Sequence, residues 1–160
     1  MTEHSDCFVC RKHRGEEAVP GGPIYQDDLI YVSHNAPPPG STAYLGWCFV
    51  EPRRHAPGLG DLMDAEAQAI GGMVTQLSRA LKAELGAEHV YAFVIGDRVP
   101  HLHVHVIVRH PGAPQEYWGV HVDEWPDAPT GDEAEVTALV ARLRSRLKTA
   151  AGASQDIEHV

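Results

Sequence analysis

The spacing of apolar residues along the chain predicts two long helices. From about Leu62 to Leu85 the apolar side chains recur every three or four residues, and Gly86 then ends the pattern. A second helix is predicted to begin near Asp132, because Asp132 and Glu135 have the D-x-x-E spacing of a capping box and a helical apolar pattern follows them. Each helix therefore has an apolar face to bury.

Short segments rich in β-branched and aromatic residues predict strands. Residues 24–34 are expected to form a hairpin, and residues 43–52, which are mostly apolar, a central strand. Residues 89–96 and 101–108 are predicted to pair antiparallel, because only the short turn D-R-V-P separates them. A short extended piece is expected at residues 119–122. Because the strands run together and the helices stand apart, we expect an α+β fold with an antiparallel sheet.

The length of 160 residues fits a single domain with its own core. We place this domain at residues 1–150. It includes an N-terminal segment at residues 1–22, which contains two cysteines, and a C-terminal extension at residues 111–150, which carries the second helix. Residues 151–160 are expected to form a flexible tail.

Composition narrows the classes of function. The formal net charge of −9 argues against sequence-independent binding of nucleic acid, because such binding needs a positive surface. Small phosphorylated ligands need only local positive charge, which histidines and arginines can supply. No apolar run approaches the length of a membrane span, and the polar N-terminal residues lack the pattern of a secretory signal. We therefore expect a cytoplasmic protein with reduced cysteines.

Three histidines alternate with apolar residues in the segment H-L-H-V-H. In a strand, alternate side chains point to the same face, so His101, His103 and His105 would lie together. Such a row can be an ordinary exposed polar face of a sheet. It can also be a metal site or a catalytic group, because neutral imidazole serves both as a metal ligand and as a nucleophile. The spacing alone does not choose between these interpretations.

Cys7 and Cys10 have the spacing of half a tetrahedral zinc site, which needs about two more nitrogen or sulfur donors. Candidate donors are His13, His34, His55, His89 and the three alternating histidines. His55 follows the predicted strand 43–52, where a ligand at a strand exit would lie. If His55 and one end of the histidine segment complete the tetrahedron, the other two histidines stay free for chemistry.

These residues resemble the histidine triad (HIT) superfamily, whose signature is His-φ-His-φ-His-φ-φ with φ apolar. Residues 101–107, H-L-H-V-H-V-I, match it at every position, and residues 49–62 are similar to the family's segment before its long helix. The resemblance extends from about Cys7 to His110 and is loose beyond, where the C-terminal extension would be variable. It implies an α+β subunit with an antiparallel sheet of about five strands, one long helix and a C-terminal helix. Such subunits usually pair as homodimers and bind nucleotides without an organic cofactor.

The resemblance also implies a role for each histidine. His103 would be the nucleophile that attacks the α-phosphorus of a nucleotide, and His105 would donate to a phosphate or leaving-group oxygen. The remaining histidine, His101, would hold a structural zinc, as in the zinc-bearing bacterial branch of the superfamily. The zinc ligands of that branch correspond to Cys7, Cys10, His55 and His101, which is the set that donor counting favours.

Purine nucleotides or nucleotide conjugates are the implied ligands, with contacts expected from His34, Asn35, Arg98 and His105. Arg98 stands where many relatives carry Ser or Thr, and the family's nucleotide-binding Asn or Asp falls near His34 or Asn35. The glutamine that follows the second histidine in galactose-phosphate uridylyltransferase has no counterpart here, which disfavours that activity.

Three functions remain open from the sequence. The preferred one is hydrolysis or transfer at the α-phosphate of a nucleoside phosphoramidate, a dinucleoside polyphosphate or a similar compound, through a nucleotidyl-histidine intermediate. The second is a nucleotide-binding or scaffolding protein with weak or no catalysis. The third is a metalloenzyme that uses the three histidines themselves as its metal site.

Overall fold

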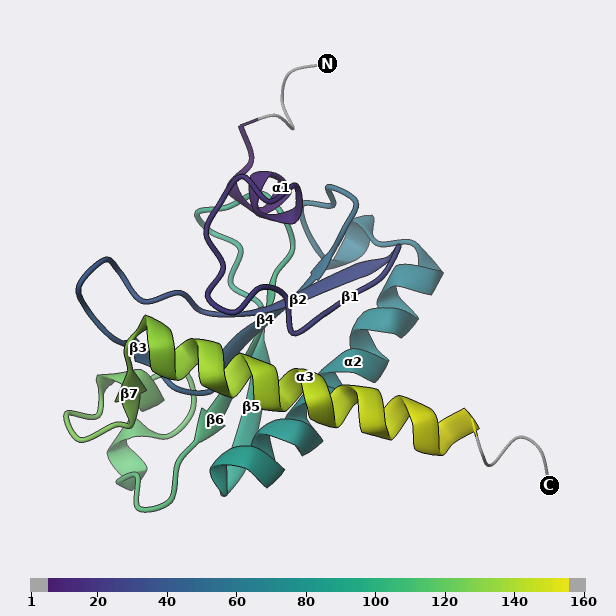
Figure 1. Cartoon of the computed structure of the whole chain (residues 1–160). Helices are drawn as coiled ribbons and strands as arrows, with labels where there is room; N and C mark the ends of the chain where they lie inside the picture. Colours follow the sequence, from purple (N-terminus) through teal and green to yellow (C-terminus); the bar gives the residue numbers. More distant parts are fainter. Residues whose placement is uncertain (1–5, 156–160) are drawn as a thin grey trace.

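A five-stranded antiparallel sheet forms the centre of the protein, which was analysed as a computed structural model that describes residues 6–155. The strands follow the order β1-β2-β4-β6-β5, and every neighbouring pair is antiparallel (Figure 1). Their bounds are β1 Tyr25–Gln26, β2 Ile30–His34, β4 Trp47–Pro52, β5 His89–Phe93 and β6 Val104–Arg109. The predicted α+β fold with an antiparallel sheet of about five strands is confirmed.

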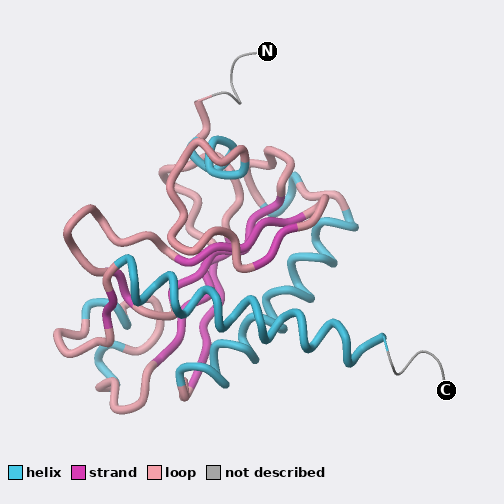
Figure 2. Tube along the Cα trace, in the orientation of Figure 1, coloured by secondary structure: helices cyan, strands magenta, loops and turns pink. Residues whose placement is uncertain are grey.

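Two long helices cover the sheet and pack against each other. Helix α2 spans Asp64–Leu85 and contacts β2, β4, β5 and β6, whereas α3 spans Glu133–Gln155 and contacts α2 and β2. Figure 2 shows the strands gathered in the middle of the molecule, with α2 and α3 around their lower part and the short helix α1, Phe8–His13, above them. None of the helices in the described part of the chain is long and apolar enough to cross a membrane.

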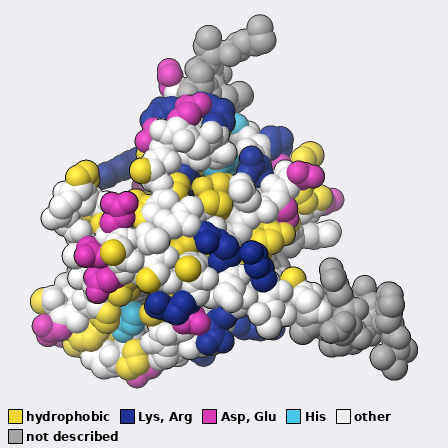
Figure 3. Space-filling view, in the orientation of Figure 1, with side chains coloured by type: hydrophobic (Ala, Val, Ile, Leu, Met, Phe, Trp, Pro, Cys, Tyr) yellow, Lys and Arg dark blue, Asp and Glu magenta, His cyan; other side chains and the backbone are white. Residues whose placement is uncertain are grey.

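The end of α2 and the start of α3 are formed by the capping residues that the sequence predicted. Gly86 ends α2 in the left-handed conformation, with φ of 62°. At the start of α3, Asp132 and Glu135 accept each other's backbone N–H at 2.9 Å, which confirms the capping box. Figure 3 shows acidic side chains near the start of α3 and Lys and Arg side chains further along it. Arg142 and Arg146 of this helix pair with Glu84 of α2.

Alternate residues of β4 point to opposite faces of the sheet, and this separates the core from the site. Cys48 and Val50 are fully buried in the core that α2 and α3 cover. Phe49 and Glu51 point to the other face, where α1 lies. The sheet therefore has one face for stability and one that is available for function.

The predicted hairpin at residues 24–34 is present as β1 and β2, but two strand predictions were wrong in extent. The predicted strand 43–52 is broken: Gly46, with φ of +92°, separates β4 from β3, Ala43–Tyr44, which pairs instead with β7, Thr130–Gly131. The connection between β5 and β6 is residues 94–103 rather than a four-residue turn. His101 and His103 therefore lie before β6, and only His105 lies in it.

Besides β7, four smaller elements of the described chain were not predicted. Helix α1 lies in the N-terminal segment, and three-residue 3-10 helices occur at η1 Leu59–Asp61, η2 Gln115–Tyr117 and η3 Val122–Glu124. Residues 119–122 form no strand. Helix α3 continues to Gln155, so the tail predicted from residue 151 begins inside a helix, and its remainder lies outside the described residues.

Gly46 permits a close approach that any side chain would prevent. A Cβ at this position would lie 2.6 Å from Cγ2 of Val108 and 2.8 Å from Cδ1 of Leu85, in addition to the unfavourable positive φ. We expect Gly46→Ala to lower the free energy of unfolding by roughly 2–4 kcal/mol, measured by chemical denaturation. The control is Gly112→Ala, where φ is +83° and nothing lies within 4 Å, with an expected loss of about 1–2 kcal/mol. Equal losses in the two variants would show that packing at Gly46 does not matter.

Candidate functional site

Two thiols and two imidazoles meet above the open face of the sheet. The ligand atoms of Cys7, Cys10, His55 and His101 all lie within 4.8 Å of one another. The Nδ1 of His101 lies 3.6 Å from Sγ of Cys7 and 3.4 Å from Sγ of Cys10, and Nδ1 of His55 lies 3.4 Å from Sγ of Cys10. Zinc bonds of about 2.3 Å to sulfur and 2.0–2.1 Å to nitrogen, arranged tetrahedrally, place sulfur and nitrogen roughly 3.6 Å apart. The donor set therefore fits zinc.

His101 is held in the protonation state that a metal requires. Its Nε2–H donates to the carbonyl oxygen of Pro52 at 2.8 Å, so the lone pair lies on Nδ1, next to the thiols. Burial lowers the pKa of His101 to about 4, which keeps the ring neutral. Burial and the hydrogen bond with Cys7 raise the pKa of Cys10 to about 11, so without a cation this thiol stays protonated at neutral pH. A bound dication would favour the thiolate.

Three separate segments bring these four ligands together. Cys7 precedes the first residue of α1 and Cys10 lies within its first turn. His55 follows β4, next to Arg54, whose guanidinium donates twice to the buried carboxylate of Glu66 in α2, at 2.9 and 2.7 Å. The hydrogen bonds from Arg54 hold the pKa of Glu66 below its usual range, so the pair remains ionised. This bidentate contact ties the segment that carries His55 to the long helix.

The other two triad histidines also have defined tautomers. The Nδ1–H of His103 donates to the carbonyl oxygen of His101 at 2.7 Å, which leaves the lone pair on Nε2. The Nε1–H of Trp47 donates to Nδ1 of His105 at 3.0 Å, so the neutral ring of His105 carries its proton on Nε2. That Nε2 is buried and has no hydrogen-bond partner among the described residues. His103 thus presents an acceptor nitrogen and His105 an unused donor.

Aromatic rings surround these two histidines. Phe93 stacks on His105 with 4.8 Å between ring centroids, and Phe49 contacts the rings of both His103 and His105. Burial, with a smaller contribution from nearby His103, lowers the pKa of His105 to about 4. The ring is therefore neutral at physiological pH.

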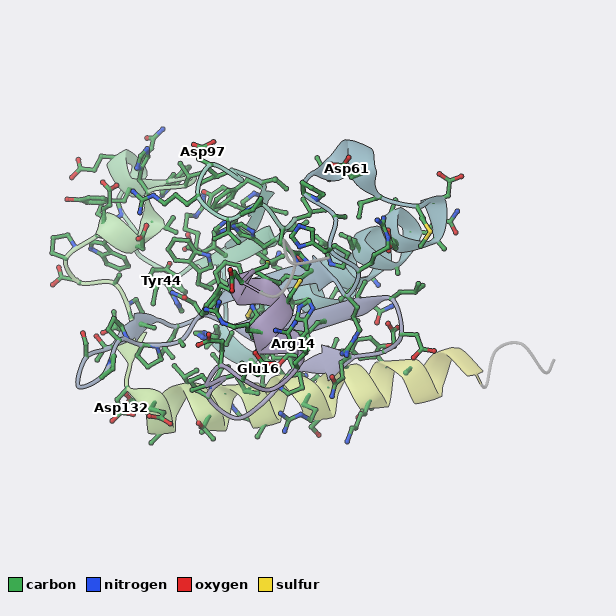
Figure 4. All side chains as sticks on the ribbon, turned by 90° about the horizontal axis from the view of Figure 1, so that it is seen from above. Arg14, Glu16, Tyr44, Asp61, Asp97 and Asp132 are labelled. Atoms are coloured by element: carbon green, nitrogen blue, oxygen red, sulfur yellow. The ribbon has the colours of Figure 1, made fainter. Side chains whose placement is uncertain are left out.

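A pocket of about 200 Å³ adjoins the two histidines, which is room for part of a nucleotide. Helix α1 supplies one side, and the connection 94–103 the other; Figure 4, seen from above, shows α1 between the loop that carries Asp97 and helix α3. The lining residues are Phe8, Val9, Lys12, Asn35, Phe49, Glu51, Val99, His103 and His105. A larger hollow of about 1090 Å³ lies between residues 36–42 and the start of α3, but no histidine or cysteine lines it.

The structure brings together most, but not all, of the residues expected at the site. Asn35 lines the pocket with His105. His34 does not: it is buried, its Nδ1–H donates to the carbonyl of Asn35, and its Nε2 accepts from the backbone N–H of Gly46, so neither nitrogen is left for a ligand. Arg98 is exposed in the connection 94–103 and does not line the pocket.

Sequence reasoning missed Lys12, Phe49 and Glu51 as pocket residues. A signal for two of them was present, because Phe49 and Glu51 alternate with the apolar Cys48 and Val50 in a predicted strand, which puts them on a common face. Nothing in the sequence placed α1 over that face.

Comparison with known proteins identifies the family. The HIT domain model matches residues 16–112, more than half of the chain. The chain belongs to the HIT family. The matched residues contain the whole triad but not Cys7 or Cys10. A search of the curated proteins found no match.

Solved HIT structures share the fold. A zinc-bound histidine triad family protein from Mycobacterium smegmatis superimposes with a TM-score of 0.69 at 20% identity, over 92% of this chain and 99% of that one. A histidine triad nucleotide-binding protein from Sulfolobus tokodaii gives 0.68 at 19% identity, over 89% and 93%. A Hit-like protein from Bartonella henselae, described as involved in cell-cycle regulation, gives 0.65 at 17% identity, over 89% and 97%.

The four-ligand geometry predicts one zinc ion per chain, and elemental analysis measures it. We expect the double variant Cys7→Ser/Cys10→Ser to lose the metal, because hydroxyls are poor zinc ligands. Cys48→Ala, which removes the buried third cysteine outside this cluster, should keep it. Metal retained by the double variant would point instead to a site made by the three histidines.

The burial of His105 predicts a loss of stability in acid. The pKa of an unfolded histidine is about 6.5, so between pH 6.5 and 4 the unfolded chain binds a proton that the folded chain excludes. Stability is thus lost as pH falls through this window, by up to about 3 kcal/mol. Denaturation of the wild type and of His105→Asn at pH 7 and pH 4.5 measures it, and the wild type should show the steeper decline. Parallel pH dependences would refute the assignment.

Proposed function

We propose that this HIT protein hydrolyses or transfers nucleotidyl groups, attacking the α-phosphate of a nucleoside phosphoramidate, a dinucleoside polyphosphate or a related nucleotide conjugate. The supporting observation is the hydrogen bond from Nδ1–H of His103 to the carbonyl oxygen of His101. This bond fixes the lone pair on Nε2 in a ring that lines the pocket. A neutral, oriented imidazole can approach a phosphate ester that repels anionic nucleophiles.

The reaction proceeds in two displacements. In the first, Nε2 of His103 forms a bond to the α-phosphorus while the bond from phosphorus to the leaving group breaks. The leaving group departs with the bonding electron pair and takes up a proton. In the second, water or another acceptor attacks phosphorus, the P–N bond breaks and its electrons return to Nε2. The nucleoside monophosphate, or its ester with the acceptor, is released and a proton is lost.

His105 supplies a hydrogen-bond donor at this centre. Trp47 holds the tautomer with the proton on Nε2, and this Nε2–H has no partner among the described residues. In the complex it would donate to an oxygen of the phosphate or of the leaving group, where negative charge develops. Because the donor is already oriented and shielded by Phe49 and Phe93, little reorganisation is needed.

The metal in this proposal is structural zinc, with no organic cofactor. A tetrahedral zinc would be held by Cys7, Cys10, His55 and His101, which would leave no position open for a substrate. The zinc would hold α1 against the loop before β6. The third hypothesis, a metal bound by the three histidines, lacks support, since among described residues only His101 of the triad belongs to a group that could hold a metal.

We also propose that the chain pairs as a homodimer in the cytoplasm. Strand β5 is an edge of the main sheet, and the residues after it include exposed Val94 and Ile95. An edge strand next to exposed apolar side chains favours pairing with a second copy. A reducing compartment would keep the cysteines available for zinc.

The role of His103 predicts a strong effect of one substitution on turnover. We expect the wild type to release AMP or GMP from the corresponding nucleoside phosphoramidate and His103→Asn to be reduced by at least about 1000-fold, because no nucleophile remains. Chromatographic detection of the monophosphate measures this.

His121→Asn is the matched control, because His121 lies on the surface outside the pocket and its side chain pairs with the exposed Glu124. It should retain wild-type turnover. Turnover that survives in His103→Asn would eliminate His103 as the nucleophile. Nucleotide affinity without turnover in the wild type would favour the binding or scaffolding function instead.

A further inference from the structure

A buried ion pair lies beside the pocket and has no part in the zinc cluster or in the triad. Nζ of Lys12 donates to Oε1 of Glu51 at 2.6 Å and to the hydroxyl of Ser33 at 3.3 Å, and Nε2–H of His13 donates to Oε2 of Glu51 at 2.9 Å. The side chains of Lys12 and Glu51 are 8% and 2% exposed. Both residues line the pocket that contains His103.

The pair ties α1 to β4, but this attachment does not require charged residues. Burying a lysine and a glutamate requires both charges to be desolvated, and an apolar pair of similar size is often as stable or more stable. Buried charges in a pocket are instead expected where a ligand forms hydrogen bonds with them. A shielded, oriented donor discriminates between ligands better than an exposed one.

The strand register places Ser33 and His105 on opposite sides of Phe49. Phe49 of β4 pairs with His105 of β6 on one side and with Ser33 of β2 on the other, so these three side chains form a row across the sheet. Lys12 binds Ser33 at the far end of this row. Two strand spacings separate the ends, roughly 10 Å. A nucleotide with its α-phosphate at His103 can span this distance and place its base beside Phe49, where Nζ of Lys12 lies 5.4 Å from the ring centroid.

Lys12 has one donor to spare. An ammonium group carries three N–H bonds, and the described residues offer oxygen acceptors for two of them, Glu51 and Ser33. The third has only the aromatic rings of Phe49 and Tyr31 nearby, with centroids 5.4 and 5.9 Å from Nζ, and these are weaker partners than an oxygen or nitrogen acceptor. Both oxygens of Glu51 already accept, from Lys12 and His13. The spare hydrogen-bonding capacity at this end of the pocket therefore favours a ligand that accepts.

We propose that Lys12, held by Glu51, reads the base of the bound nucleotide and favours 6-oxo purines, guanine and hypoxanthine, over adenine. N7 accepts hydrogen bonds in guanine, hypoxanthine and adenine alike, so the discrimination lies at position 6. There O6 of a 6-oxo purine accepts from the remaining N–H of Lys12, whereas the amino group of adenine can only donate. This inference rests on the proposed function and specifies its substrate class.

Calorimetric titration of the zinc-loaded protein with GMP, IMP and AMP tests the preference. We expect GMP and IMP to bind at least about tenfold more tightly than AMP, a difference that corresponds to roughly 1.4 kcal/mol. Equal binding of the three nucleotides, or tighter binding of AMP, overturns the inference, and this result needs no variant.

The double variant Lys12→Met/Glu51→Leu assigns the preference to the pair. It replaces both charges with apolar side chains of similar size, so no lone charge is buried, and thermal melting checks that it folds. The ratio of AMP to GMP dissociation constants should fall to about one. Lys82→Met, at the exposed end of α2, is the matched control and should keep the wild-type ratio. A folded double variant that keeps the preference also overturns the inference.

Failure of this inference and failure of the proposed function give different results. If the nucleoside phosphoramidates are cleaved at equal rates and the three monophosphates bind equally, the α-phosphate chemistry stands and only base reading by Lys12 is refuted. If no monophosphate binds and no phosphoramidate is cleaved, both are refuted.

Discussion

The buried histidine at position 101 is the point on which the whole site depends. Its side chain is 0% exposed and makes contacts in three directions. Nδ1 faces the two thiols, Nε2–H donates to the carbonyl of Pro52, and its own carbonyl accepts from His103. The residue that would bind zinc therefore also orients the ring that would attack phosphorus. A shift of His101 would disturb the metal geometry and the tautomer of His103 together.

The two faces of the sheet explain why such a site can exist in a small domain. Helices α2 and α3 cover one face, and the fully buried side chains of Cys48 and Val50 contribute to the core there. This core stabilises the fold without the help of the other face. The other face can then carry histidines and a buried ion pair, which contribute little to stability but are suited to binding and chemistry.

The sequence predicted the features that depend on local pattern. Helical spacing located α2, and the D-x-x-E motif located the start of α3. Donor types narrowed the ligands that join Cys7 and Cys10, and the resemblance to the HIT superfamily then selected His55 and His101, which lie in the metal cluster. The sequence-based predictions failed where tertiary contacts determine the bounds of a strand. An extended loop and a strand share the same alternation, so the pattern could not show that His101 and His103 precede β6. Likewise, the break at Gly46 depends on how closely Val108 and Leu85 approach its backbone.

The N-terminal segment shows why family membership alone does not describe this site. The HIT domain match begins at residue 16, yet the residues before it supply two thiols of the metal cluster and one wall of the pocket. Helix α1 has only six residues, too few to be stable by itself. It is held over the sheet by Cys7 and Cys10 at one point and by the bond of Lys12 to Glu51 at another. The contacts that hold α1 also set the shape of the pocket beside His103, so zinc bound at this cluster would influence which ligand the pocket accepts.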